Sequence, residues 1–197
     1  MAQNILKHSI ELLLVGGSAG SLEVIIQVFP LLLSNLPFAI VMVLHRKHDS
    51  DSALVELLAS KTTLPVQEAS EKDFLIPGNV YIAPPDYHLL IEDDRSLSLD
   101  YSEKINFSRP CIDVTFETAA EVYGNQAAAL LLSGASADGS KGLEKISSCG
   151  GLIAVQNPDD ADVPYMPQKA LELNPNAEII DSQNIAAFIN SLALRHH

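Results

Sequence analysis

The chain has 197 residues, 47% of them hydrophobic, which suits one sizeable core better than two. We therefore expect a single domain over residues 1–197. With 12 basic and 25 acidic residues the formal charge is −13, and this charge argues against nucleic acid or an anionic membrane surface as a partner, since both carry negative charge.

The two cysteines, Cys111 and Cys149, form neither a metal-binding pair nor a disulfide framework of the kind found in small secreted domains. Glu11 interrupts the apolar stretch near the N-terminus, and no small-residue cleavage site follows it. No apolar run is long enough to span a bilayer. These observations predict a cytoplasmic protein without membrane insertion.

Short apolar runs rich in Val, Ile and Leu recur along the chain, at residues 10–16, 38–44, 79–83, 127–134, 151–156 and 177–181. Runs that are apolar on both faces are typical of strands in a parallel sheet. Amphipathic stretches that suit helices lie between or after them, at residues 21–33, 51–60, 111–124, 140–151, 166–174 and 182–194. Gly124 and Gly150 are placed to end two of these helices. The alternation predicts an α/β fold with a doubly wound, mainly parallel sheet flanked by helices.

One segment, residues 88–100, breaks this alternation. Two short strand-like runs flank a polar Asp-Asp-Arg turn within it. This pattern predicts one β-hairpin that projects from the main sheet.

The pentapeptide GGSAG, residues 16–20, follows the first predicted strand. It lacks the glycine spacing of a dinucleotide fingerprint and the Lys-Ser/Thr pair of a phosphate loop, so we predict no nucleotide cofactor. It does match G-x-S-x-G, in which a serine nucleophile stands between a strand and a helix. The alternative is that Ser18 only caps the helix that begins near Ser21.

A serine nucleophile needs a base and a carboxylate that orients the base. His45 directly follows the second strand, and Asp138 follows the strand that begins at residue 127. Because the carboxyl ends of parallel strands share one edge of the sheet, Ser18, His45 and Asp138 are candidates to converge there. Taken singly, His45 is also compatible with a turn histidine, and Asp138 with a helix N-cap or an Asx turn.

The segment HRKHDSD, residues 45–51, offers a competing interpretation. Its two imidazoles and two carboxylates are candidate ligands for a divalent metal that activates water. Arg46 and Lys47 oppose a bound cation, and a solvated loop with Asp49 or Asp51 near the positive end of a helix fits better. We therefore predict no metal site.

From about residue 11 to residue 185, the chain resembles the catalytic domain of the protein-glutamate methylesterases of bacterial chemotaxis, the CheB family. The matching segments are GGSAG (16–20), LH (44–45), PGNVYIAPPDYHLLI (77–91), SRPCIDVTFETAA (108–120), SGASADGSKGL (133–143), and AVQNP with MPQKAL (154–171). Their order and spacing cover most of the chain, which is far more specific than G-x-S-x-G alone.

The resemblance implies one methylesterase-like catalytic domain that acts as a serine-dependent carboxylic-ester hydrolase. Members remove methyl groups from glutamate methyl esters on receptor helices, and they often deamidate glutamines there. The implied partners are therefore methyl-accepting chemotaxis receptors. Carried over by position, Ser18 is the nucleophile, His45 the general base and Asp138 the orienting acid, which agrees with the strand-end reasoning.

The resemblance also implies residues that bind the substrate and stabilise the oxyanion. Backbone N–H groups near Ser18 and at the start of the following helix are expected to hold the oxyanion. The expected set is Ala19, Gly20, His88, Arg109, Ala135 and Met166. For His88 the alternative is packing in the core or hairpin, and for Arg109 it is a surface ion pair.

Four positions depart from the family pattern. Ser21 stands where the family usually has a second glycine, Ala135 and Ser136 replace the Met-Gly of a Gly-Met-Gly loop, and Tyr165 replaces the glycine before Met-Pro. These changes fall in loops expected to shape the site. Because the triad is kept, we favour an active enzyme with altered specificity over a catalytically impaired docking or signalling module of the same fold.

The family's phosphorylatable receiver domain is expected to be missing, because the first predicted strand starts within ten residues of Met1. Three alternatives are then open: constitutive activity, control by a separate regulatory partner, or a chain that is a part cut from a larger protein.

Overall fold

The computed structural model describes residues 9–45 and 51–196. They form a seven-stranded, all-parallel sheet in the order β3-β4-β2-β1-β7-β8-β9. The strands are β1 (Leu12–Gly17), β2 (Ala39–Leu44), β3 (Val66–Glu68), β4 (Val80–Ile82), β7 (Ala127–Leu131), β8 (Leu152–Gln156) and β9 (Glu178–Ile180). The predicted α/β class with a mainly parallel sheet is confirmed. The edge strand β3 was not predicted, because it is only three residues long and half-exposed.

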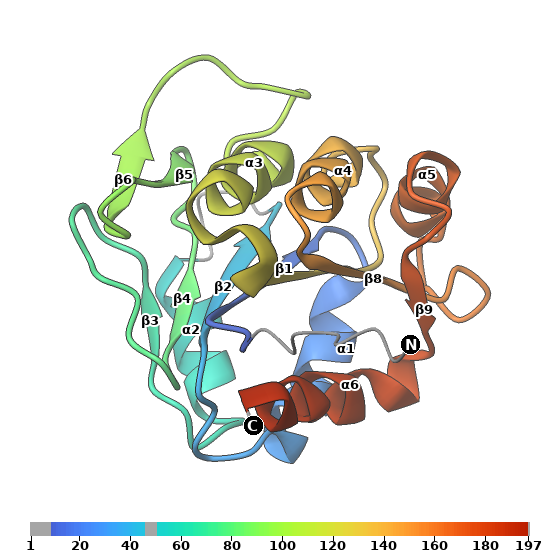
Figure 1. Cartoon of the computed structure of the whole chain (residues 1–197), viewed down its shortest axis with the longest axis horizontal. Helices are drawn as coiled ribbons and strands as arrows, with labels where there is room; N and C mark the ends of the chain where they lie inside the picture. The colour runs from blue at the N-terminus through green and yellow to red at the C-terminus, as the bar shows by residue number, and fades with distance from the viewer. Residues whose placement is uncertain (1–8, 46–50, 197) are drawn as a thin grey trace, which may run out of the picture.

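Helices cover both faces of the sheet (Figure 1). One face carries α1 (Ser21–Val28), α2 (Asp51–Ala59) and α6 (Ile185–Leu192), and the other carries α3 (Ile112–Tyr123), α4 (Ser140–Ser148) and α5 (Tyr165–Leu173). Short 3-10 turns occur at Phe29–Leu31, Gly124–Gln126, Ser182–Asn184 and Ala193–His196. The two layers of helices enclose one sheet and bury one apolar cluster on each of its faces.

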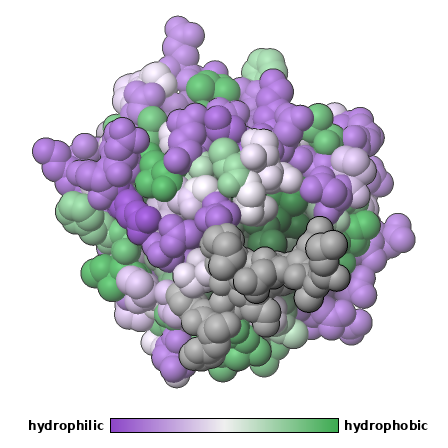
Figure 2. Space-filling view, in the orientation of Figure 1, coloured by the Kyte–Doolittle hydropathy of each residue, from purple (hydrophilic) through white to green (hydrophobic). Residues whose placement is uncertain are grey.

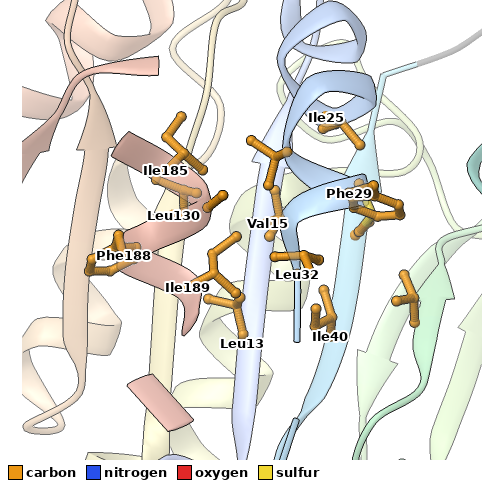
Figure 3. Packing of buried hydrophobic residues seen from close by; sticks show 14 of the residues in the cluster. Leu13, Val15, Ile25, Phe29, Leu32, Ile40, Leu130, Ile185, Phe188 and Ile189 are labelled. Carbon is orange, nitrogen blue, oxygen red and sulfur yellow. The ribbon is translucent and has the colours of Figure 1, made fainter. Parts of the chain in front are cut away.

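The central strand β1 contributes to both apolar clusters because successive side chains point to opposite faces. Leu13 and Val15 lie in the cluster with Phe29 and Ile189, which come from the helical layer of α1 and α6 (Figure 3). Leu14 lies in the opposite cluster, with α3 and α4. This two-sided burial explains why the strand is apolar at nearly every position.

The helix ends follow local sequence. Gly124 (φ 52°) ends α3 and Gly150 (φ 86°) follows α4, and both adopt the positive φ that glycine tolerates best. Helix α1 ends at Val28 and is therefore shorter than the predicted helix over residues 21–33. Pro30, which has no N–H to donate, lies in the 3-10 turn that follows.

The predicted hairpin is present as β5 (His88–Ile91) and β6 (Leu97–Asp100), which pair antiparallel in a separate two-stranded sheet. Its turn is stabilised by Asp94, whose carboxylate accepts hydrogen bonds from the N–H and hydroxyl of Ser96. A long loop, residues 101–111, then arches back to the start of α3, yellow-green in Figure 1. This loop brings side chains to the edge of the sheet where β1 ends.

Hydrophilic side chains cover most of the face shown in Figure 2, and apolar side chains form separate patches between them. Within residues 9–45 and 51–196, no helix combines the length and the apolar character needed to cross a bilayer.

Candidate active site

Ser18 stands directly after β1, the strand from which the sheet is built outward in both directions. Its neighbours β2 and β7 lie on either side, so Ser18 occupies the switch point where α/β sheets usually bind ligands. Its N–H donates to Ser133 O after β7 (2.9 Å), and the His45 N–H donates to Gly17 O (3.1 Å). The ends of these three strands are therefore held together at one edge, as the sequence predicted.

His45 and Asp138 form a close pair at this edge, with Nε2 of the imidazole 2.8 Å from Oδ2 of the carboxylate. An ionised carboxylate only accepts hydrogen bonds, so Nε2 carries the proton and Nδ1 is left as the acceptor. Ser18 and His45 line the same pocket. These two described side chains form no hydrogen bond with each other in this structure without substrate, a common situation before substrate binds.

The Asp138 carboxylate is fully buried and densely hydrogen-bonded. Besides His45, the donors from the described residues are the backbone N–H groups of Ile112 (2.7 Å), Asp113 (3.0 Å) and Gly139 (3.0 Å), the Cys111 thiol (3.1 Å) and the Asn106 amide (3.1 Å). Burial acts to raise the pKa of Asp138, but the hydrogen bonds from His45 and from the start of α3 outweigh it and lower the pKa to about 2. Asp138 is therefore ionised at neutral pH.

The start of α4 tests the N-cap alternative for Asp138. Gly139 occupies the N-cap position of α4, so Asp138 does not cap that helix. Its oxygens instead accept the first N–H groups of α3, whose N-terminus carries the positive end of the helix dipole. The Cys111 thiol beside it stays protonated and donates, because burial and the Asp138 charge raise its pKa.

Asn106 bridges two buried carboxylates and was not singled out from the sequence. Its Nδ2 donates to Asp138 Oδ1 (3.1 Å) and to Asp113 Oδ2 (2.9 Å). Asp113 is 5% exposed and also accepts the Gly142 N–H (2.8 Å). Burial raises the pKa of Asp113 to about 6, and the charge of Asp138 adds to the increase. The only sequence signal for Asn106 is its residue type, since asparagine tolerates the φ of 51° found here.

Two backbone N–H groups beside Ser18 are candidate oxyanion donors. The first is that of Ala19, which donates to no acceptor in the described part of the chain. The preceding carbonyl, Ser18 O, accepts the N–H (3.1 Å) and the hydroxyl (2.6 Å) of Ser21. Because N–H and C=O point in opposite directions across a trans peptide, Ser21 fixes the direction of the Ala19 N–H. This gives the departure at Ser21 a structural role.

The second candidate donor is the Ala135 N–H, which likewise has no acceptor among residues 9–45 and 51–196. The preceding carbonyl, Gly134 O, accepts the Met166 N–H (2.9 Å), which holds that peptide in place. A Cβ at Gly134 would lie 2.9 Å from Ser18 Cβ and 2.7 Å from Met166 Sδ, so only glycine fits between them. The Ala135 peptide therefore lies directly beside Ser18.

The interpretation of Ser18 as a helix cap is wrong. The N-cap of α1 is Gly20, with φ 80°, and no side chain caps this helix. A Cβ at Gly20 would approach Ser133 Oγ to 2.7 Å, so glycine is required here for both its conformation and its lack of a side chain. The Ser18 hydroxyl is thus not used as a cap.

His88 and Arg109 do not line the pocket at Ser18. His88 is buried, with Nδ1 accepting the Cys111 N–H (3.2 Å) and Nε2 donating to Glu103 O (3.0 Å). Arg109 donates to Ser102 O (2.5 Å), and its guanidinium stacks 4.1 Å from the ring centre of Tyr101. Both side chains hold the loop that carries Asn106, so their support of the site is indirect.

Ser136 and Tyr165 are the other two positions that depart from the family pattern. Ser136 Oγ accepts the Asp138 N–H at 3.4 Å. Tyr165 begins α5, is 46% exposed and is not among the residues that line the Ser18 pocket. The competing interpretation placed a metal site in residues 45–51, of which residues 46–50 lie outside the described residues. Within the described ranges no group of three His, Cys, Asp or Glu side chains is arranged to hold a metal ion.

Comparison with known proteins confirms the family resemblance found in the sequence. The profile of a family described as CheB methylesterase matches residues 13–189. A Leptospira interrogans protein named for protein-glutamate methylesterase and protein-glutamine glutaminase activity is 40% identical over 176 residues, which cover 89% of this chain and 91% of that protein. A Thermotoga maritima protein-glutamate methylesterase/protein-glutamine glutaminase is 34% identical over 165 residues, 82% of this chain but 48% of its own length. This chain thus spans about half of the Thermotoga protein.

The fold also matches a solved structure. The crystal structure of the Thermotoga maritima CheB methylesterase catalytic domain superimposes with a TM-score of 0.88 at 31% sequence identity. The match covers 94% of this chain and all of that domain.

Proposed function

Because this chain belongs to the CheB methylesterase family, we propose that it is a serine-dependent enzyme that hydrolyses glutamate methyl esters on chemotaxis receptors. The observation that carries the proposal is His45 paired with the buried Asp138 carboxylate at the pocket that Ser18 also lines, together with two backbone N–H groups that have no acceptor among the described residues. We further propose that residues 1–197 act as one catalytic domain in the cytoplasm. A single main sheet with one apolar cluster on each face supports the single domain.

In the first step, Ser18 Oγ attacks the ester carbonyl carbon while His45 Nδ1 accepts the hydroxyl proton. The resulting imidazolium is stabilised through Nε2 by ionised Asp138. The carbonyl oxygen gains negative charge and is held by the N–H groups of Ala19 and Ala135. Removing one such donor in a serine hydrolase costs about 3–4 kcal/mol of transition-state stabilisation.

In the second step, the bond between the carbonyl carbon and the methoxy oxygen breaks, and His45 returns its proton to that oxygen. Methanol leaves, and an acyl-enzyme remains on Ser18. Water then attacks the acyl-enzyme with His45 again as the base, which releases a glutamate carboxylate and restores Ser18. The same sequence with ammonia as the leaving group would serve the glutaminase activity for which the relatives are named.

The test is methanol release from a methylated receptor fragment, measured for the wild type and for Ser18→Ala. Ser60→Ala is the matched control, because Ser60 is an exposed serine just after α2. We expect release by the wild type and the control and a loss of at least about a thousandfold in Ser18→Ala. Absence of release from wild-type protein that still binds the fragment would favour the alternative, a docking or signalling module.

A further inference from the structure

A pocket of about 250 Å³ opens beside Ser18, and its described lining is almost entirely apolar. The lining residues are Ser18, Ser21, Leu22, Leu44, His45, Ala53, Leu54 and Leu57. None of these described side chains is an acid, a lysine or an arginine. A cavity of about 150 Å³ is enough to hold benzene, so this pocket is far larger than the methyl group of a methyl ester requires.

The pocket lies on one particular side of the nucleophile. Its walls come from the start of α1, the end of β2 and the first two turns of α2. In the sheet, β2 and β7 are on opposite sides of β1. His45 follows β2 and lines the pocket, whereas Ala135 follows β7 and does not. The pocket is therefore on the side of the general base and away from the Ala135 donor.

This placement determines which part of an ester can enter. In the tetrahedral intermediate the former carbonyl oxygen is held by the oxyanion donors, and the leaving oxygen must lie close to His45 to receive its proton. The alcohol part of the ester is attached to that leaving oxygen. It therefore extends along the His45 side, where the apolar pocket begins.

We propose that this pocket binds the alcohol part of the ester, and that the protein also hydrolyses carboxylic esters of apolar alcohols larger than methanol. The proposal rests on the proposed function, since it uses the same nucleophile and base. Ser18 Oγ bonds to the acyl carbon, the carbon–oxygen bond to the alcohol breaks, and the Ser18 proton passes through His45 to the departing alcohol. Water then releases the acid, so atoms and protons balance without another reactant.

The lining also separates alcohols from ammonia as leaving groups. Apart from Ser18 and His45, the polar residue in the described lining is Ser21. Its hydroxyl already donates a hydrogen bond to Ser18 O. An apolar alcohol gains from burial against the leucines, whereas ammonia gains nothing from them. The pocket therefore favours esters over amides.

The experiment compares the γ-methyl and γ-n-butyl esters of N-acetylglutamate amide, with kcat/KM measured for the full chain. The butyl ester is expected to react roughly ten- to fiftyfold faster, because three additional methylene carbons are partly to fully buried at the transition state. Ser18→Ala is expected to abolish the hydrolysis of both esters.

Two helix variants test whether the pocket causes the preference. Ala53→Leu adds three carbons to the pocket wall, the same number that butyl adds to methyl, so the butyl-to-methyl ratio should fall to about one. Ala59→Leu makes the same change at an exposed position of the same helix that does not line the pocket, so the ratio should stay as in the wild type.

The outcomes separate the two proposals. Ser18-dependent hydrolysis with the methyl ester as fast as the butyl ester overturns the alcohol pocket and leaves the methylesterase intact. Rates that increase with acyl length in a series of methyl esters, but not with alcohol length, also overturn it, because the pocket would then hold the acyl chain. Absence of Ser18-dependent hydrolysis of both esters overturns the alcohol pocket, and absence of methanol release from the receptor fragment as well overturns both proposals.

Discussion

His45 Nε2 donates to Asp138 Oδ2 at 2.8 Å, so Nδ1 is the ring nitrogen available to Ser18. In the serine proteases of the chymotrypsin type the ring is used the other way round, with the aspartate on Nδ1 and the serine on Nε2. The difference matters for substitutions at His45, because a side chain can imitate one ring nitrogen without the other.

Glutamine at position 45 can imitate only Nε2. We expect His45→Gln to keep a hydrogen bond to Asp138 and so to remain within about 1 kcal/mol of the wild type in the free energy of unfolding. It offers no base, so methanol release should fall by at least about a thousandfold. His45→Ala should lose both the activity and about 1.5–3 kcal/mol of stability, since a buried charge loses a donor. Urea unfolding of the three proteins checks this order, and equal stability of the two variants would contradict it.

The hydroxyl of Ser21 is expected to affect turnover through the Ala19 peptide. Ser21→Ala removes the 2.6 Å bond to Ser18 O but leaves the backbone N–H bond. We expect kcat to fall roughly three- to tenfold with little change in KM, because the oxyanion donor is used only in the transition state. Ser60→Ala is the matched control, since Ser60 Oγ makes the same type of bond, also 2.6 Å, to Leu57 O. A KM effect alone would contradict this role.

Asn106 is expected to act as a positioning residue for Asp138. Asn106→Ala removes the amide that joins the two carboxylates, so the pKa of each should rise, because the charged forms lose a donor. We expect kcat to fall about tenfold and the acidic limb of its pH profile to move to higher pH. Asn176→Ala, at an exposed asparagine bonded to Ser147 Oγ, should change neither. If Asn106→Ala lowers the free energy of unfolding but leaves the pH profile of kcat unchanged, Asn106 has only a structural role.

Asp113 should make the stability of the protein fall as pH rises. Its pKa is raised from 3.8 to about 6 in the folded state, so its contribution is fully present below pH 3.8 and is lost as pH rises through 6. Asp138 acts in the opposite direction, but its lowered pKa confines that effect to pH values below about 4. The window from pH 4.5 to 7.5 therefore separates the effect of Asp113 from that of Asp138.

Within that window, the wild type should lose about 1–3 kcal/mol of unfolding free energy relative to Asp113→Asn, which cannot ionise. Urea denaturation of both proteins at pH 4.5 and 7.5 measures the difference. If the free energies of the two proteins change in parallel with pH, Asp113 does not titrate in this range.

Much of the architecture follows from local sequence. Apolar runs on both faces predicted six of the seven parallel strands, and the polar turn at residues 93–95 predicted the hairpin. Ser18, His45 and Asp138 were predicted to meet because strand ends share an edge. Edge strand β3 was missed since Val66–Glu68 is too short and too exposed to produce an apolar pattern.

The details of the site depend on a loop whose path the sequence does not reveal. Asn106 reaches Asp138 only because residues 101–111 fold back over the start of α3. His88 and Arg109 were predicted around the site from the family resemblance, yet their partners are backbone groups of the loop, two carbonyls and the Cys111 N–H. Such contacts are set by the tertiary course of the chain, which leaves no periodic signal.

The ring of donors around Asp138 also makes catalysis a reporter of complete assembly. Its partners come from positions 93, 32 and 26 residues away along the chain, at His45, Asn106 and Ile112. No contiguous fragment that lacks part of the stretch from His45 to Gly139 can supply all the donors. Turnover is thus a more demanding criterion of the native state than helix content.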